Sequence, residues 1–288
     1  MHEKSRHDAR SLIVDESLAG SRLDHALARV LPELGLRGRK RFIENGWVRV
    51  DDRPAAAALR LRAGQRIAIL PGPEPAGTPE LSVVERCGGY AALLKPAGLH
   101  SAALAGGGGP SAEALLPALF PEARPRLLNR LDFLTSGLLL TALDDAAAKA
   151  YAALDPLKVG KEYLAVVVGV LAEPLELKRR LDTEDRRRTR VMGKLEPDSR
   201  LWTFVWPEAA LAGERTLVRV RIHSGARHQI RAHLAAAGLP ILGDPLYGED
   251  EAGGLFLHHG GLEFPGFSAR CAPSWLDGLE RLTSPEDQ

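Results

Sequence analysis

Residues 129–137, with the sequence Asn-Arg-Leu-Asp-Phe-Leu-Thr-Ser-Gly, place a carboxylate close to a guanidinium and just before a turn. The apolar run Leu138–Leu140 follows at once and predicts a buried strand. Asp132 is therefore expected where a loop enters the core. A carboxylate kept ionised there could attack a carbon, stabilise a cation or remove a proton. An acid that caps a turn is the simpler interpretation of an isolated Arg-Leu-Asp tripeptide, so the case for chemistry depends on the rest of the chain.

Two further segments carry side chains that could join Asp132 in one site. Lys95 ends an apolar stretch and precedes a bend that Pro96 and Gly98 favour, which predicts a lysine at the end of a strand. Tyr163 lies near the start of an apolar segment that predicts a strand. Taken alone, the first segment is a common turn and the second a tyrosine at a strand edge.

A third segment, residues 223–234, holds the largest group of polar candidates. It follows an alternating strand and predicts a helix. His228 and Arg231 are three residues apart and share a helical face, and Arg227 lies four residues before Arg231. A zinc site at His228 and His233 is excluded, because five residues turn about 140° around a helix and no third ligand is placed.

Five segments, in the same order along the chain, resemble the signatures of the RluA-type pseudouridine synthases. They are residues 90–99, 129–137, 161–169, 223–234 and 239–248, which resemble the family patterns N-K-P-A-G-L, H-R-L-D-x-x-T-S-G, K-x-Y-x-A-x-V-x-G, G-R-T/S-H-Q-I/L-R-x-H and P-I/L-x-G-D-x-x-Y-G. Each match is weak alone, but five in order are strong evidence. The resemblance implies an α+β fold with a mixed, largely antiparallel sheet, flanking helices and a central cleft.

The resemblance also implies a role for each candidate. Asp132 is implied to be the catalytic aspartate, Arg231 its partner, and Tyr163 the ring that packs against the reacting base. Arg130 is implied to fill the space that a flipped base leaves. Asp244 is the main rival carboxylate, and we interpret its segment as a structural loop that braces the site. Substrate or RNA contacts are further expected from Lys95, Asn129, Arg227 and His228.

The chain departs from the family patterns at positions that bear on RNA contacts. Asn129 stands where the family usually has His, and Ala226 where it usually has Arg. Asp132, Arg130 and Tyr163 are all present, so we expect these departures to affect RNA binding and substrate choice more than the chemical step. Arg227 is adjacent to Ala226, and we expect that it replaces the missing guanidinium.

The implied reaction breaks the N1–C1′ bond of a uridine in RNA and rebonds the uracil through C5. It needs no redox step and no group donor. The sequence accordingly predicts no cofactor and no metal: the four glycines at 106–109 lack the Lys-Ser/Thr of a phosphate-binding loop. Nucleophilic attack by Asp132, stabilisation of a sugar cation and proton removal to give a glycal all remain open.

The N-terminal part resembles an S4-like RNA-binding domain, with two short helices followed by a small basic sheet. Four cations lie together there and are expected to contact successive phosphates: Arg37, Arg39, Lys40 and Arg41. The expected organisation is a tail at 1–20, the S4-like domain at 21–70, a Pro/Gly linker at 71–80, the catalytic domain at 81–276 and a second tail at 277–288.

Composition and charge agree with a soluble RNA-binding enzyme. The 288 residues carry a net charge of only +1, but residues 1–70 contain 14 Lys/Arg against 9 Asp/Glu, and residues 178–194 contain 8 against 3. Such local basic regions favour a polyanion partner, and we expect RNA, with ribosomal RNA favoured over transfer RNA. The lack of a long apolar run predicts no membrane span. The two isolated cysteines indicate a reducing cytoplasm. A monomer is expected.

Two alternatives remain open from the sequence. A catalytically inactive RNA-binding protein that keeps the fold, such as a ribosome assembly factor, is suggested by the changes at Asn129 and Ala226. A carboxylate glycosidase is the other alternative, but it needs a second acid at a defined distance, and no motif supplies one.

Overall fold

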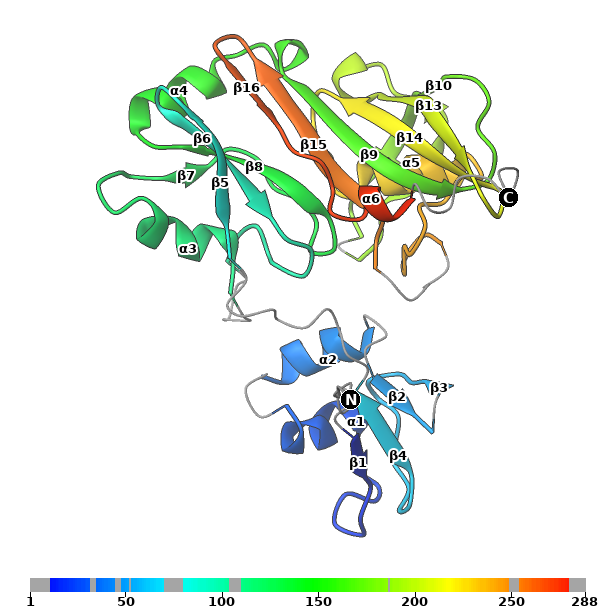
Figure 1. Ribbon diagram of the computed structural model, residues 1–288. Helices are drawn as coiled ribbons and strands as arrows, with labels where there is room; N and C mark the ends of the chain where they lie inside the picture. The colour runs from blue at the N-terminus through cyan, green and yellow to red at the C-terminus, as the bar shows by residue number, and fades with distance from the viewer. Residues whose placement is uncertain are drawn as a thin grey trace, which may run out of the picture. The chain divides into compact units, whose positions relative to one another are not determined.

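The computed structural model describes residues 11–31, 35–44, 48–51, 53–69, 80–103, 110–185, 187–248 and 254–279. The chain divides into two compact units, one formed by residues 1–78 with 104–109, the other by 79–103 with 110–288 (Figure 1). The linker expected at residues 71–80 lies outside the described residues apart from Glu80.

The smaller unit is a four-stranded antiparallel sheet with helices, and its strand order is β1-β4-β2-β3. Its elements are β1 (Ser11–Ile13), α1 (Leu23–Ala26), the 3-10 turn η1 (Leu27–Arg29), α2 (Leu36–Glu44), β2 (Val48–Val50), β3 (Arg53–Pro54) and β4 (Arg66–Ile69). The tail expected at residues 1–20 is wrong in its second half. β1 pairs with β4, and Val14 and Leu18 are buried in the core of this unit. Apolar side chains before residue 21 thus extend the domain.

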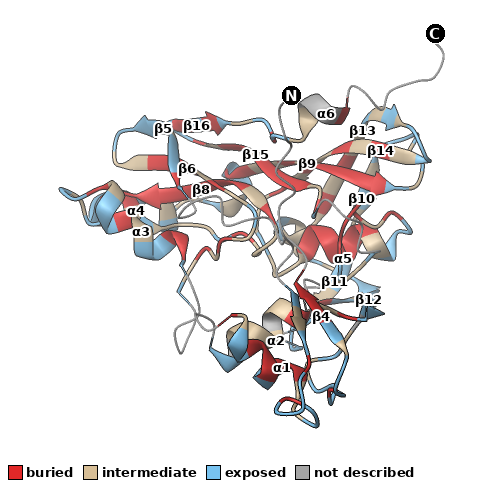
Figure 2. Ribbon diagram, turned by 60° about the horizontal axis from the view of Figure 1, so that its bottom comes forward, coloured by how far each residue is buried: buried red, intermediate tan, exposed pale blue. Residues whose placement is uncertain are grey.

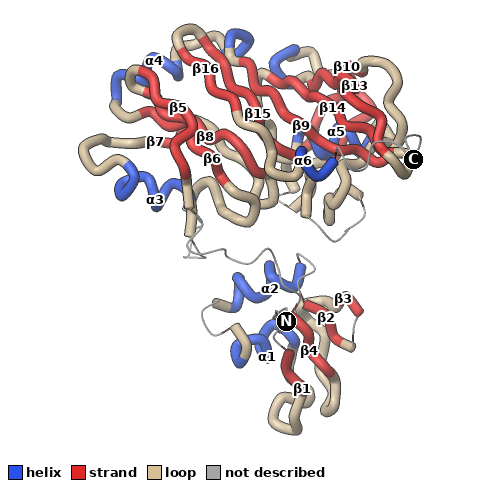
Figure 3. The backbone as a smooth tube through the Cα atoms, in the orientation of Figure 1, coloured by secondary structure: helices blue, strands red, loops and turns tan. Residues whose placement is uncertain are grey.

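The larger unit is built on one ten-stranded sheet (Figure 3), whose path is β10-β13-β14-β9-β15-β8-β6-β5, with β16 beside β15 and β7 beside β8. The strands are β5 (Ser82–Cys87), β6 (Tyr90–Lys95), β7 (Arg126–Leu127), β8 (Ser136–Ala142), β9 (Gly160–Val168), β10 (Leu175–Leu177), β13 (Thr203–Leu211), β14 (Arg215–Ile222), β15 (Leu257–Phe264) and β16 (Phe267–Arg270). Among the described strand pairs only β8 and β15 run parallel. The expected α+β class with a mixed, largely antiparallel sheet is confirmed.

Helices lie on both faces of this sheet. They are α3 (Ala112–Leu119), α4 (Asp145–Ala152), α5 (Gln229–Ala236) and α6 (Leu276–Leu279), with 3-10 turns η2 (Pro156–Lys158) and η3 (Ser199–Leu201). α5 is largely buried and lies on the face opposite α6 (Figure 2). The tail expected from residue 277 begins too early, because Leu279 at the end of α6 is buried against Val166 and Leu242. No helix of the described part is long and apolar enough to span a membrane.

The basic segment at residues 178–194 lies outside the ten-stranded sheet. It forms a separate hairpin of β11 (Arg179–Asp182) and β12 (Arg190–Leu195).

The parallel contact of β8 with β15 joins the two halves of the sheet. It pairs Ser136 with His258 and Gly137 with His259. Gly137 has φ of 117°, and a Cβ there would meet the backbone nitrogen of His259 at 2.5 Å. Only glycine permits this close approach, which fixes the start of β8.

Candidate active site

The loop between β7 and β8 holds Asp132 in a defined place. The hydroxyl of Ser101 accepts from the amide of Leu131 and donates to its carbonyl, both at 2.8 Å. On the other side, the amide of Gly98 donates to the carbonyl of Phe133 at 2.8 Å. Both neighbours of Asp132 are therefore anchored. The Asp132 side chain itself remains 26% exposed, so a substrate can reach it.

Arg231, on α5, joins two carboxylates. Its Nη1 donates to Oδ2 of Asp132 at 3.2 Å, and its Nε and Nη2 donate to the two oxygens of Asp244, each at 2.8 Å. Burial disfavours its charge, but the hydrogen bonds and charge of Asp244, with the charge of Asp132, raise the pKa of Arg231. This contact agrees with the pairing of Asp132 and Arg231 that the family resemblance implied.

Asp244 lies in a loop that braces the site, as the sequence suggested. Its side chain is fully buried, and Oδ1 also accepts from the amides of Leu246 and Tyr247 at 2.9 and 3.1 Å. Burial works against ionisation, yet the hydrogen bonds and charge of Arg231 and these amides lower the pKa of Asp244. The fixed carboxylate of Asp244 thus orients Arg231, and Nη1 of Arg231 then faces Asp132.

Tyr163, on β9, is buried on the same face of the sheet as α5 and packs in the same core as Ile230. Burial first, and then the negative charge of Asp132, raise the pKa of Tyr163, so its hydroxyl stays protonated. Its ring stacks on that of His259, with centroids 4.5 Å apart and planes at 21°. Tyr163 can therefore present a neutral aromatic side chain near the carboxylate.

Lys95 ends β6 and is completely buried. Its Nζ donates to the carbonyls of Pro96 and Leu99 at 2.9 Å each, and to that of Phe133 at 3.4 Å. All three ammonium donors are used by the backbone, so Lys95 braces the Asp132 loop rather than pointing to solvent. Burial lowers the pKa of Lys95 to about 7, and the charge of Asp132 opposes this shift.

The two residues before Arg231's helix are placed differently from the expectation. α5 begins at Gln229, and His228 caps it with φ of 53°, so Arg227 and His228 do not continue the helical face. Nε2 of His228 lies 3.9 Å from Oδ1 of Asp132, and burial, before any charge effect, lowers the pKa of His228. Arg227 donates through Nη2 to the carbonyls of Thr183 and Asp185, and so anchors the basic segment. Arg227 therefore does not share the helical face of Arg231, and its expected RNA contact stays a prediction.

Asn129 and Arg130 precede the loop and have different environments. The Asn129 side chain accepts from the amide of Leu140 at 2.7 Å and donates to the carbonyl of Leu138 at 3.3 Å. Its amide completes hydrogen bonds along β8, which argues against the expected RNA contact. Arg130 is exposed, as a side chain that inserts into RNA must be.

The cations of the smaller unit are only partly described. Arg37 and Arg41 lie in α2, but their side chains fall outside the described residues. Arg39 and Lys40 are half-buried, and Nζ of Lys40 lies 3.9 Å from Oδ2 of the fully buried Asp24. Their expected phosphate contacts stay predictions.

Sequence reasoning missed two neighbours of the site. The Tyr247 hydroxyl accepts from the amide of Thr189 at 2.7 Å and contacts Nδ1 of His228 at 3.2 Å. The Arg231 guanidinium lies 5.4 Å from the Tyr247 ring centroid. Tyr247 stands in the segment 239–248, where its spacing from Asp244 was the available signal. His259, in β15, is the second, and no pattern in the sequence indicated its contact with Tyr163.

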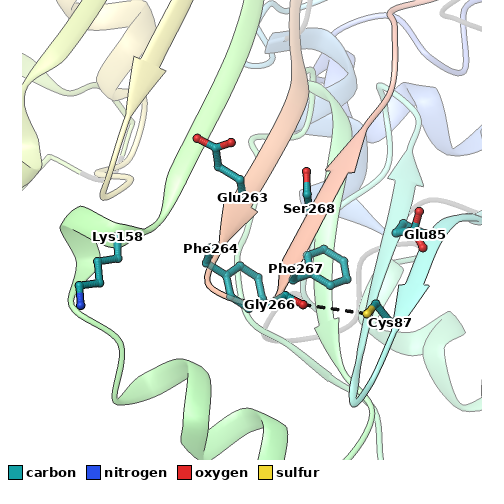
Figure 4. Close-up of a pocket in the computed structure, with 8 residues that line it drawn as sticks. All are labelled: Glu85, Cys87, Lys158, Glu263, Phe264, Gly266, Phe267 and Ser268. Carbon is teal, nitrogen blue, oxygen red and sulfur yellow. Dashed lines mark hydrogen bonds between the residues drawn. The ribbon is translucent and has the colours of Figure 1, made fainter.

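An open pocket of about 650 Å³ lies elsewhere, at the β15–β16 turn (Figure 4), and is lined by Glu85, Cys87, Lys158, Glu263, Phe264, Gly266, Phe267 and Ser268. Asp132 is near the opposite end of β15, where His258 pairs with Ser136. This pocket is therefore separate from the candidate site. Within the described residues, no group of three or more His, Cys, Asp or Glu side chains could hold a metal ion.

Known proteins resemble this chain in sequence and in fold. The family model for RNA pseudouridylate synthase matches residues 89–236. An uncharacterized RNA pseudouridine synthase of Chloroflexus aurantiacus is 31% identical over 84% of this chain and 79% of its own length. The ribosomal large subunit pseudouridine synthase D of Xanthomonas campestris is 30% identical over 83% and 75%. The structure of human RNA Pseudouridylate Synthase Domain Containing 1 has a TM-score of 0.60 at 25% identity and covers 75% of this chain and 95% of its own. The chain belongs to the RluA-type family of RNA pseudouridine synthases.

Proposed function

We propose that this enzyme converts uridine to pseudouridine in structured ribosomal RNA, with Asp132 as the catalytic carboxylate. The observation that carries the proposal is the pair of Asp132 and Arg231 at 3.2 Å, with Arg231 fixed from behind by the buried Asp244. This pairing places a fixed positive charge beside the Asp132 carboxylate and orients it toward the space that a bound base would fill. The neighbouring neutral Tyr163 supplies an aromatic face for a uracil.

The proposed step is an isomerisation in which atoms balance within one nucleotide. The N1–C1′ bond breaks, the uracil turns, and C5 bonds to C1′. The hydrogen on C5 leaves, and N1 gains one. The anion at Asp132 supports the break by attacking C1′, by stabilising a sugar cation or by removing a sugar proton, and Arg231 holds it in place throughout.

RNA binding is assigned to cations around the site and in the smaller unit. Arg130 is exposed beside Asp132, where it can occupy the gap left by the extruded base. The basic hairpin of β11 and β12, anchored by Arg227, would contact phosphates. We assign the smaller unit an S4-like role because its two helices and small sheet carry Arg39 and Lys40. Relatives named for the ribosomal large subunit favour ribosomal RNA as substrate.

Asp132→Asn tests the proposal. The substrate is ribosomal RNA whose uridines are tritiated at C5, because the proposed step releases that hydrogen. We expect the variant to release no tritium while binding RNA as the parent does. Asp145→Asn is the matched control, since Asp145 is an exposed acid at the start of α4 that pairs with Arg126 of β7, and the variant should keep full activity. Turnover by Asp132→Asn would remove Asp132 from the mechanism.

A further inference from the structure

His259 has an unusual setting for a histidine. It is completely buried on β15, and its ring lies parallel to that of Tyr163, with centroids 4.5 Å apart. Its Nδ1 donates to the carbonyl of Leu138 at 2.6 Å, because a carbonyl can only accept. Burial lowers the pKa of His259 to about 3, so the ring is neutral at physiological pH. A neutral ring stacks on a tyrosine without bringing a buried charge.

The backbone around His259 is fixed as firmly as its ring. His259 pairs with Tyr163 across β9 and β15, and with Gly137 across β8 and β15. The close approach to Gly137 tolerates no side chain there. The same contacts that set the start of β8, and so the Asp132 loop, thus also set the ring against Tyr163.

We propose that His259 is a positioning residue, which backs the Tyr163 ring so that its other face receives the extruded uracil. The inference rests on the proposed function and deepens it. A tyrosine ring turns about two side-chain bonds, and a parallel neighbour restricts both. The base would then complete a stack of three rings: His259, Tyr163 and uracil. RNA affinity comes mainly from phosphate contacts, which His259 does not make. We therefore expect a substitution at His259 to change kcat rather than RNA affinity.

Three substitutions isolate the ring. His259→Phe, His259→Leu and His259→Met all lose the hydrogen bond to Leu138, but only Phe keeps an aromatic face. We expect His259→Phe to retain kcat within about threefold, whereas Leu lowers kcat by about tenfold or more at unchanged KM. A methionine side chain fills irregular space well. If His259→Leu does not fold, His259→Met takes its place in the comparison. Val205→Ala, in the same hydrophobic core as Tyr163, is the control for a loss of packing in that core away from the His259 ring.

A double-mutant cycle with Tyr163→Leu separates positioning from packing. If His259 acts through Tyr163, His259→Leu has no further effect on kcat in the Tyr163→Leu background. Equal kcat for the Phe and Leu variants, or additive losses in the cycle, would overturn the inference. The proposed function fails separately, when the parent protein releases no tritium or when Asp132→Asn still does.

Discussion

The buried ammonium of Lys95 should make the stability of the protein depend on pH in a way that can be measured. Its ammonium is completely buried and donates to three backbone carbonyls, one of them belonging to Phe133 beside Asp132. Replacing it with Met keeps the approximate volume and removes the titrating group. Apart from the titration of Lys95, which its folded and unfolded pKa values describe, the loss of its side-chain contacts shifts the whole stability curve of Lys95→Met without changing its slope.

The slope follows from the two pKa values of the lysine. Burial lowers the pKa of Lys95 from 10.5 to about 7 in the folded protein. Between these values the unfolded chain binds a proton that the folded protein does not, so the free energy of unfolding rises with pH. At about 1.4 kcal/mol per pKa unit, the Lys95 contribution grows by about 2.7 kcal/mol from about pH 6 to about pH 9.

Urea unfolding of the parent and Lys95→Met over this pH range measures the effect. The difference in free energy of unfolding between the two proteins should change by the amount given, in favour of the parent at high pH. Histidines contribute equally to both proteins and cancel. Lys158→Met is the matched control, because Lys158 is exposed. A difference that stays constant across the range would refute the reasoning from burial.

Two further predictions concern the frame around Asp132. Asp244→Asn should lower the free energy of unfolding by about 3 kcal/mol, since it leaves the buried Arg231 with one carboxylate. It should also flatten the acid limb of the stability curve, because the lowered pKa of Asp244 adds stability that is lost as pH falls through the folded value; an unchanged limb would contradict this. Gly137→Ala should cost about 3 kcal/mol or more by thermal unfolding, because its Cβ would meet the His259 backbone; wild-type stability would show that β15 can move aside.

The sequence predicted those parts of the site that local pattern encodes. The apolar run after Asp132 predicted β8, and the alternating strand before residue 223 predicted β14. The pairing of Asp132 with Arg231 came from the family resemblance. The loop that carries Asp244 was expected to brace the site, but its hydrogen bonds to Arg231 were not predicted, because only the fold shows that a loop after α5 turns its carboxylate back to that helix.

Other outcomes depend on contacts that no local pattern reveals. Arg227 and Asn129 were expected to contact RNA, but the side chain of each meets backbone groups of another segment, the β11–β12 loop for Arg227 and β8 for Asn129. The parallel contact between β8 and β15, which brings His259 to Gly137, joins strands far apart in the chain. β1 was missed because three residues give too short an alternation to separate from a tail.

The parallel seam between β8 and β15 has a consequence for how activity arises during folding. Asp132 enters from one side of this seam, while Arg231 packs on the other, and the two residues are 99 positions apart. Contacts of such high sequence separation form late, since the entropy of closing the intervening loop must be overcome first. Recovery of turnover after dilution from denaturant should therefore lag behind recovery of secondary structure, and would report when the two halves of the sheet have joined.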